Sequence, residues 1–280
     1  MAYDQRQRAR AFRDLHIGEV LVLPNAWDAG SARIMEAAGS RAIGTTSGGI
    51  SWSLGLADGQ QITRDEMLNV VKRIADAVDV PVTADIESGY GIDAKAVAES
   101  VREAIGAGAV GINLEDSPGE SGAALLSPEA QAVRIAAARD VATVANLDLF
   151  INARIDVYLF NVGEPSARLA NVLGRAKAYA AAGADGVFVI GLADEQPIRE
   201  LVRELSLPLN IGLAPGGPNV KTLASWGVAR VSAGTAIAQS SFGLIKSATA
   251  EFLHHGTYDA ISGGIAYADM NALFARQEVR

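Results

Sequence analysis

Short apolar runs that end in polar or glycine residues recur eight times along this 280-residue chain. Between the runs lie segments whose apolar residues repeat at helical spacing, and strands that alternate with helices are typical of a parallel sheet. No linker or break in composition divides these units, so we predict one α/β domain over residues 1–280, a (β/α)8 TIM-type barrel. A doubly wound sheet with a second domain is the alternative. The eight predicted strand runs are residues 20–28, 41–49, 80–91, 109–117, 149–156, 186–192, 208–217 and 229–235.

Both ends of the chain are expected to add helices to this barrel. Residues 1–18 carry charges at helical spacing and lack the apolar core of a signal peptide, which predicts an amphipathic surface helix. Residues 236–256 form a long helical segment with an apolar face, followed by a tail. This apolar surface predicts either packing against another subunit in a homo-oligomer or closure of the barrel's own outer ring.

The composition excludes several kinds of partner and chemistry. A net charge of −8 provides no basic surface for nucleic acid or for an anionic membrane. The sequence has no uninterrupted apolar stretch of about 18 residues, so no membrane span is predicted. The absence of cysteine excludes disulfides, thiolate metal sites and a cysteine nucleophile. We therefore expect a cytoplasmic protein with neither nucleic acid nor membrane as a partner.

In a parallel barrel the active site lies where the strands end, so polar residues just after each apolar run are the candidates. None of the five lysines stands there, which argues against a Schiff-base aldolase. The three histidines lie in the terminal helical regions, so imidazole catalysis would require His254 or His255 from a neighbouring subunit. The candidates are Asn25, Asp28, Thr46, Ser47, Gly48, Gly49, Asp85, Glu87, Tyr90, Asn113, Glu115, Asp116, Asn152, Arg154, Asp156, Asn210 and Ser232.

Acidic residues dominate the ends of the third and fourth runs. In an extended chain alternate side chains face the same side, so Asp85 and Glu87 are expected to converge with Glu115 on the neighbouring strand. Three crowded carboxylates would repel and take up protons unless a cation neutralises them, and their oxygen atoms suit Mg²⁺ better than zinc. The alternative is that strand-end acids pair with arginines or cap helices, which is the expectation for Asp116 and Asp156.

Arg154 is the one cation among these strand ends. Its guanidinium can bind a substrate carboxylate through two hydrogen bonds, or it can offset Glu115 across the sheet. The sequence TTSGG at residues 45–49 adds hydroxyls and glycine N–H groups that suit a carboxylate or a phosphate, although glycine turns are common. A metal, an arginine and such a loop together predict a site for a small 2-oxo acid.

Several motifs, in order along the chain, resemble those of the isocitrate lyase/phosphoenolpyruvate mutase superfamily. They are LPNAWDAGSARIMEAAGSRAI, TSGGISWSLGLADG, ADIESGYG, INLEDS, INARID and VARVSAGT. The resemblance implies a (β/α)8 barrel that assembles as a dimer or tetramer, with the long C-terminal helix exchanged between subunits. It also implies Mg²⁺ as the cofactor and a small 2-oxo acid or dicarboxylate as the substrate.

The resemblance further implies roles for individual residues. Asp85 matches the direct Mg²⁺ ligand, and Arg154 matches the arginine near the oxyanion. The acids that would hold the water ligands of the ion are Asp58, Glu87 and Glu115, with Glu87 in place of the usual aspartate. Asn210 and Tyr90 are added because they also follow predicted strands. The expected substrate-binding residues are then Ser47, Gly48, Gly49, Asp85, Arg154 and Asn210. The expected catalytic residues are Arg154, Glu115 and Tyr90.

The loop after the fourth run departs from the superfamily pattern. Lyases of the superfamily carry Lys-Arg-Cys-Gly-His there, with the cysteine as the catalytic acid, whereas residues 115–129 read EDSPGESGAALLSPE. Cleavage of isocitrate or methylisocitrate by the usual route is therefore not expected. Ser117, Ser121 and Tyr90 are the candidates for the missing proton donor, unless they only shape the loop.

These observations lead to a main hypothesis and three alternatives. The main hypothesis is an Mg²⁺-dependent lyase that acts on a small 2-oxo acid or related carboxylate through a metal-bound pyruvate enolate, by C–C cleavage or decarboxylation. The first two alternatives are a phosphonopyruvate-type C–P hydrolase or mutase, and a 2-oxo acid binding protein without turnover. The third is a phosphosugar enzyme, suggested by GLAPGGPN and SAGT after the last two runs but lacking a base. Gly106, Gly108 and Gly111 match a dinucleotide fingerprint in spacing only, because they precede a strand.

Overall fold

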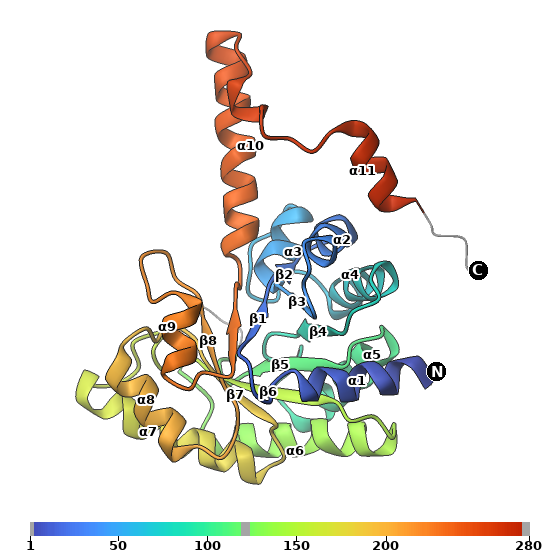
Figure 1. Cartoon of the computed structure of the whole chain (residues 1–280). Coiled ribbons are helices and arrows are strands. Elements are labelled where there is room, and N and C mark those ends of the chain that lie inside the picture. Colours follow the sequence, from blue (N-terminus) through green and yellow to red (C-terminus); the bar gives the residue numbers. More distant parts are fainter. Residues whose placement is uncertain (1–2, 119–123, 276–280) are drawn as a thin grey trace.

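The computed structural model describes residues 3–118 and 124–275. Nine short parallel strands form one sheet in the order β1-β9-β8-β7-β6-β5-β4-β3-β2, a nearly closed barrel with helices around it (Figure 1). All eight predicted runs contain strands, which confirms the predicted (β/α)8 fold class. The strands are β1 (Leu21–Leu23), β2 (Asn25–Ala26), β3 (Ile43–Thr45), β4 (Val82–Asp85), β5 (Gly111–Glu115), β6 (Phe150–Ile155), β7 (Gly186–Val189), β8 (Leu209–Gly212) and β9 (Arg230–Ser232).

The first predicted run is divided between two strands. Pro24 separates β1 from β2, and proline cannot donate a ladder hydrogen bond. β1 pairs with β9, whereas β2 pairs with β3. This single segment of chain therefore joins the two edges of the sheet and completes the ring.

Helices follow the strands around the outside of the barrel, and every predicted helical segment contains one. The helix α3 was not predicted, because residues 45–49 were expected to form a glycine loop. Ser47, Gly48 and Gly49 instead form the first turn of this helix, with Thr46 as its N-cap. The helices are α1 (Tyr3–Asp14), α2 (Ala29–Ala37), α3 (Ser47–Ser53), α4 (Arg64–Ala77), α5 (Ala94–Gly106), α6 (Pro128–Val144), α7 (Pro165–Ala181), α8 (Glu195–Glu204), α9 (Val220–Ser225), α10 (Ala236–His255), the 3-10 turn η1 (Asp259–Ile261) and α11 (Tyr267–Phe274).

The barrel wall has an apolar outer face and a polar inner face. On β5, Ile112 and Leu114 are fully buried in the core that includes apolar side chains of the surrounding helices. Asn113 lies between them and turns the other way, where the side-chain amide of Asn152 donates to its Oδ1 at 2.9 Å. The same amide of Asn152 also donates to Oδ1 of Asn210 at 3.1 Å. Hydrogen-bonded amides therefore occupy the inside of the barrel below the strand ends.

The helix α1 packs where β5 and β6 begin, at the end of the barrel opposite the strand ends that carry the site candidates. The ring of His16, just after this helix, stacks on Phe150 with 4.0 Å between centroids. Phe12 meets the edge of both rings. Nδ1 of His16 lies 2.8 Å from the carbonyl of Phe12, which accepts its proton, and Nε2 is buried without a partner. The predicted amphipathic helix is thus confirmed over residues 3–14.

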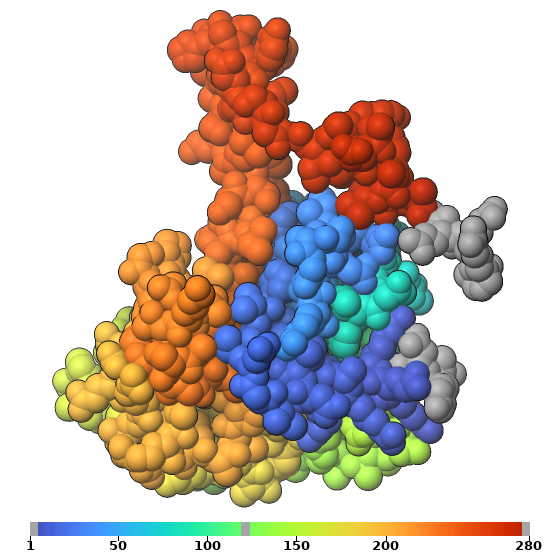
Figure 2. Space-filling view, in the orientation of Figure 1, coloured from blue at the N-terminus to red at the C-terminus, as the bar shows by residue number. Residues whose placement is uncertain are grey.

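The helix α10 projects away from the barrel, and α11 returns toward α2 (Figures 1 and 2). The return is fixed by Arg33 of α2, which donates to the carbonyl of Leu273 at 2.9 Å. The apolar face predicted for residues 236–256 does not close the outer ring of its own barrel. Its large side chains are exposed in the single chain, among them Leu244, Ile245, Phe252 and Leu253. Within the described residues, α10 included, no helix combines the length and apolarity required to span a bilayer.

The buried imidazole of His16 predicts a loss of stability in mild acid. Burial, with smaller contributions from the charges of Arg230 and Arg13, lowers the pKa of His16 from its ordinary 6.5 to about 3. The unfolded chain takes up this proton near pH 6.5 and the folded chain does not, so the stability is complete above pH 6.5 and is lost toward pH 3. Between pH 7 and pH 5 we expect the wild type to lose about 2 kcal/mol more unfolding free energy than His16→Gln. Urea unfolding at both pH values measures the difference, and equal losses would contradict it.

Candidate active site

A cavity of about 820 Å³ opens at the carboxyl ends of the strands. This is the end of a parallel barrel where active sites form. The cavity brings together residues from the loops after β3, β4, β5 and β6, which are far apart in sequence. The residues that line it are Ser47, Asp58, Gly59, Gln60, Gln61, Glu87, Ser88, Gly91, Ile92, Glu115, Ser117, Pro118, Arg154, Leu159 and Phe160.

Asp85 is the last residue of β4 and lies just beneath the cavity. The hydroxyl of Ser47 donates to its Oδ2 at 3.3 Å, and the backbone N–H of Glu87 donates to its Oδ1 at 3.3 Å. Burial raises the pKa of Asp85. The positive charge of Arg154 lowers this pKa in part, and the negative charge of Asp58 raises it again. The structure therefore places Asp85 between the first turn of α3 and the loop after β4.

Glu87 reaches the cavity by a route that differs from the predicted one. The strand ends at Asp85, and Glu87 has a φ of +51°, so alternation along an extended strand does not bring the two side chains together. A left-handed conformation is uncommon for a residue with a side chain, and such conformations are enriched at functional sites. The turned side chain accepts from the backbone N–H of Gln60 at 2.8 Å and from the hydroxyl of Tyr90 at 3.3 Å.

Asp58 comes from the exposed loop between α3 and α4 and completes the acidic group. A Cβ placed on Gly48 would lie 3.1 Å from Oδ2 of Asp58 and 2.9 Å from the methyl of Thr235, so Gly48 is required for this close approach. Burial raises the pKa of Glu87 to about 7, and the charges of Asp85 and Asp58 contribute to the rise. Burial and the neighbouring acids thus both disfavour the charged form of Glu87.

Arg154, on β6, is bound by two acids at once. Its Nε and Nη2 donate to the two carboxylate oxygens of Asp156 at 2.7 and 3.1 Å, and its Nη1 lies 2.7 Å from Oε2 of Glu115. Burial lowers the pKa of Arg154, but Glu115 and Asp156 outweigh it and raise the pKa overall. Burial likewise raises the pKa of Glu115, against the effect of Arg154. The predicted offset of Glu115 by Arg154 is therefore present, and both side chains also line the cavity.

The acids fit a hydrated ion better than a fully ligated one. Within residues 3–118 and 124–275, no three histidine, aspartate or glutamate side chains lie close enough together to hold one metal ion directly. A site with one direct carboxylate ligand and further acids that bind water suits Mg²⁺, which keeps several of its waters. The charges of Asp58 and Asp85 both act on Glu87, so these three acids could hold such an ion, while Glu115 is paired with Arg154.

Asp116 and Asp156 have structural partners, as expected. Oδ2 of Asp116 accepts from Arg175 at 2.9 Å and from the Tyr179 hydroxyl at 2.8 Å, and its Oδ1 accepts from the N–H of Asp156 at 3.0 Å. Arg175 also donates to the carbonyl of Leu126 at 2.8 Å. This buried cluster connects both ends of the loop after β5 to α7. It also connects the loop to Asp156, which binds Arg154.

Other predicted residues lie at or away from the cavity. Ser117 lines it and donates to Glu115 at 2.6 Å, whereas Ser121 lies outside the described residues. Tyr90 contacts the site only through Glu87. Asn210 is not among the residues that line the cavity, because its amide is bound to Asn152 and Ser232 inside the barrel.

Sequence reasoning missed a second arginine beneath the site. Arg230 begins β9 and is fully buried inside the barrel, where Nη2 donates to Asn113 at 3.5 Å. Among the described residues, neither Nε nor Nη1 has a hydrogen-bond partner. Burial lowers its pKa to about 9, and the charge of Asp85 opposes the change. Arg230 stands at the start of its strand rather than at the end, so the strand-end rule does not find it. The cavity-lining residues Gln60, Leu159 and Phe160 were also missed.

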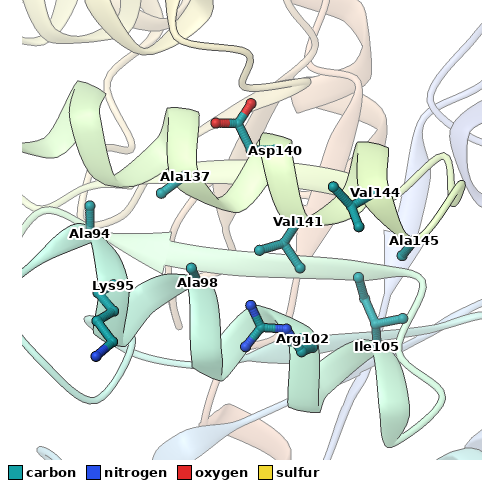
Figure 3. Close-up of a pocket in the computed structure, with 10 residues that line it drawn as sticks. All are labelled: Ala94, Lys95, Ala98, Arg102, Ile105, Ala137, Asp140, Val141, Val144 and Ala145. Atoms are coloured by element: carbon teal, nitrogen blue, oxygen red, sulfur yellow. The ribbon is translucent and has the colours of Figure 1, made fainter.

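A second cavity, of about 530 Å³, lies outside the barrel between α5 and α6 (Figure 3). Alanine and valine side chains of the two helices form most of its wall, with Lys95, Arg102 and Asp140 around it. Among the described residues that line it, Asp140 is the only acid. The chemistry of the molecule is therefore assigned to the barrel mouth.

The chain is similar to known proteins in sequence and in fold. The family model described as phosphoenolpyruvate phosphomutase matches residues 12–253. The chain is 36% identical over 272 residues to an uncharacterized protein of Mycobacterium tuberculosis, covering 96% of this chain and 98% of that protein. It is 32% identical over 222 residues to the oxaloacetate decarboxylase of Rhodopseudomonas palustris, covering 75% and 72%. Among solved structures, a Burkholderia cenocepacia protein assigned provisionally as a lyase or mutase aligns with a TM-score of 0.92 and 35% identity over 99% of both chains.

The buried pair of Asp116 and Arg175 is expected to contribute to the unfolding free energy. Arg175→Met leaves the buried carboxylate of Asp116 without its charged partner, which we expect to lower the unfolding free energy by about 3–5 kcal/mol. Lys72→Met is the control, because Lys72 pairs with Asp76 on the surface, where such a pair contributes about 0–1 kcal/mol. Urea unfolding of both variants provides the comparison. Similar losses in the two variants would show that the cluster does not hold the loop.

Proposed function

Because the chain belongs to the phosphoenolpyruvate phosphomutase family, whose relatives include lyases and mutases, we propose that it is an Mg²⁺-dependent lyase. Its substrate is a small 2-oxo acid or related carboxylate, and the reaction is C–C cleavage or decarboxylation through a pyruvate enolate. The observation that supports this most is the group of acids at the barrel mouth, Asp58, Asp85 and Glu87, beside the charged Arg154.

In this proposal Asp85 is the direct ligand of Mg²⁺. Asp58, Glu87 and Glu115 hold the water ligands, and the raised pKa of Glu87, caused by burial and then by the charges of Asp85 and Asp58, supports a cation there. When bound, the ion would supply Lewis-acid chemistry at the 2-oxo oxygen of the substrate.

Arg154 binds and orients the reacting end of the substrate. Its guanidinium is fixed by Asp156, so it is already positioned before negative charge develops in the transition state. Ser47, in the first turn of α3, donates a hydrogen bond to Asp85. We propose that Ser47 and this turn bind the substrate carboxylate. Ser117, Glu115 and Tyr90 remain the candidates for moving a proton, Ser117 through its hydrogen bond to Glu115.

Decarboxylation suits this chain best among the possible reactions. Loss of CO₂ needs no acid to protonate the departing fragment, and residues 115–129 contain no cysteine, lysine or histidine. The similarity to an oxaloacetate decarboxylase supports the same choice. A C–P bond-cleaving activity is favoured by the phosphomutase family model and is the second candidate. Binding of a 2-oxo acid without turnover is the third.

We also propose that the protein self-associates as a dimer or tetramer through α10, with this helix exchanged between subunits. The support is the row of exposed apolar side chains on a helix that projects from its own barrel. Leaving so much apolar surface in water is unfavourable by about 25 cal/mol per Å², so a second copy is a natural cover.

The activity is tested by measuring pyruvate release from oxaloacetate, 2-methylmalates and phosphonopyruvate, with Mg²⁺ and with a chelator. We expect product from at least one compound, lost on chelation, and a fall of about 100-fold or more in kcat/KM for Asp85→Ala and Arg154→Ala. Asp140→Ala, an exposed acid on α6, is the matched control and should retain the wild-type rate. A rate that is indifferent to chelation would refute the metal-dependent lyase, and binding without any product would favour the third candidate.

The assembly is tested by light scattering on purified protein. We expect the wild type to have a multiple of the 29.1 kDa chain mass, and a variant with Leu244→Glu and Phe252→Glu to approach the monomer. The control is Lys246→Glu, which changes the charge of the same helix without removing apolar surface. A monomeric wild type, or a double variant of unchanged mass, would contradict the role of α10.

A further inference from the structure

A turn after β4, residues 86–91, directs Glu87 into the cavity and is called the Glu87 turn below. Glu87 and Tyr90 have left-handed backbones, with φ values of +51° and +55°, and Gly89 between them has a φ of +85°. A residue with a side chain keeps such a conformation only where the surrounding structure holds it there. The position of Glu87 therefore depends on the contacts that hold this turn.

The guanidinium of Arg134, on α6, binds two carbonyls of the Glu87 turn. Its Nη2 donates to the carbonyl of Gly91 at 3.0 Å and to the carbonyl of Ser88. Arg134 is only 2% exposed, so water does not compete for these hydrogen bonds. The guanidinium is planar and its donors point in fixed directions, so it fixes the two carbonyls relative to each other.

The same arginine connects the Glu87 turn to the end of β5. Its Nη1 donates to Oε1 of Gln131 at 2.6 Å, and the buried amide of Gln131 donates to the carbonyl of Glu115 at 3.1 Å. The N–H of Glu115 donates in turn to the carbonyl of Glu87 at 3.0 Å. Two neighbouring residues on one face of α6 therefore link the backbones that carry Glu87 and Glu115.

Arg134 is an unusual residue to bury, because the acceptors of its hydrogen bonds are two carbonyls and one amide, all uncharged. Buried arginines normally pair with carboxylates, and a buried charge without such a partner is unfavourable for stability. Burial accordingly lowers the pKa of Arg134, and the charge of Glu115 opposes the change. The geometry that the guanidinium imposes on the turn explains this side chain better than stability does.

The Glu87 turn also holds the loop that carries Asp58. The backbone N–H of Gln60 donates to Oε2 of Glu87 at 2.8 Å, and the side-chain amide of Gln60 donates to the hydroxyl of Ser88. Gln60 is itself left-handed, with a φ of +57°. A shift of the turn is therefore transmitted to Asp58, two residues before Gln60, as well as to Glu87.

We propose that Arg134 is a positioning residue of the barrel-mouth site. It is not among the described residues that line the cavity, and it acts through the backbone of the Glu87 turn. By fixing this turn, it holds Glu87 and Asp58 in the positions from which they bind the water ligands of a metal ion. The proposal rests on the proposed function for the metal ion, whereas the hold on the turn is independent of it.

Hydrogen exchange measures the hold on the turn without any ligand. In Arg134→Met we expect the amides of residues 58–61 and 86–91 to exchange about tenfold or more faster than in the wild type, because the turn loses both carbonyl contacts. The strand β8, on the opposite side of the barrel, is the internal reference and should keep its wild-type exchange. Unchanged exchange in the turn, or an equal acceleration in β8, would overturn the proposal.

Titration calorimetry with Mg²⁺ measures the consequence for the site. We expect Arg134→Met to bind Mg²⁺ about fivefold or more weakly than the wild type, because Glu87 and Asp58 are no longer held in place. A merely structural role would lower the stability and leave this affinity unchanged. Wild-type affinity for Mg²⁺ in Arg134→Met, together with faster exchange in the turn, would therefore refute the positioning role.

Arg139→Met is the matched control on the same helix. Arg139 also donates to backbone carbonyls, those of Leu149 and Gly183, each at 3.1 Å, and it pairs with Asp185. These residues precede β6 and β7, at the end of the barrel opposite the site. We expect Arg139→Met to keep the wild-type affinity for Mg²⁺ and the wild-type exchange of residues 86–91. A loss equal to that of Arg134→Met would show that the effect is not specific to Arg134.

Arg134→Lys separates the shape of the guanidinium from its charge. Lysine keeps the positive charge but has a single compact donor group, which cannot replace the planar fork, so we expect exchange in the turn to rise about threefold or more. Wild-type exchange in Arg134→Lys would contradict the proposed hold on the turn. This variant also decides the question if Arg134→Met does not fold.

The two proposals fail in different ways. If the wild type does not bind Mg²⁺, the metal-dependent lyase is wrong, and exchange in the Arg134 variants alone decides whether this residue holds the turn. If the wild type binds Mg²⁺ but exchange in the turn is the same in Arg134→Met and Arg139→Met, the positioning role is wrong and the proposed function stands.

Discussion

The positive charge of Arg154 is the interaction on which the barrel mouth depends. The other charged side chains that line the cavity are acidic, and burial raises the pKa of Glu87 and Glu115. The guanidinium is aimed by Asp156, whose backbone is bound in turn by Asp116, and Asp116 is paired with Arg175 on α7. The orientation of one cation in the site thus depends on a buried network that reaches the outer helices. Because this network is satisfied internally, it provides a rigid frame for chemistry at the strand ends.

Much of the fold was predictable because each repeated strand and helix has its own spacing of apolar residues in the sequence. Each strand is a short apolar run and each helix an amphipathic segment, so their alternation predicts a parallel barrel without any tertiary information. The errors occurred where local signals are ambiguous. Gly48 and Gly49 suggest a loop, yet they are helical. Glycine is required there because Asp58, Thr235 and Trp27 approach too closely for a side chain. The division of the first strand at Pro24 depends on pairing with two different neighbours, which no local pattern records.

The site was predictable where it follows from topology and not where it depends on loops. Parallel strands bring their carboxyl ends together, which is enough to nominate Asp85, Glu115 and Arg154. Glu87 was nominated for the wrong reason, since a left-handed turn rather than strand alternation directs its side chain. Asp58 entered only through resemblance, because an exposed loop acid has no distinctive pattern. Leu159 and Phe160 have a role only through their position beside the cavity, so their sequence context offered no signal.

The pairing of β1 with β9 affects how the chain can fold during its synthesis. These strands come from opposite ends of the chain, and the ring closes only when Leu21–Leu23 meets Arg230–Ser232. A nascent chain emerging from the ribosome therefore exposes the edge of β1 until nearly all of its partner strands have been synthesised, and contacts between such distant residues slow folding. The strands that carry Asp85, Glu115 and Arg154 are adjacent in the order β4, β5, β6, and each pairs with the next. The sheet edge that carries these three residues therefore needs no contact with β1 for its own strand pairing.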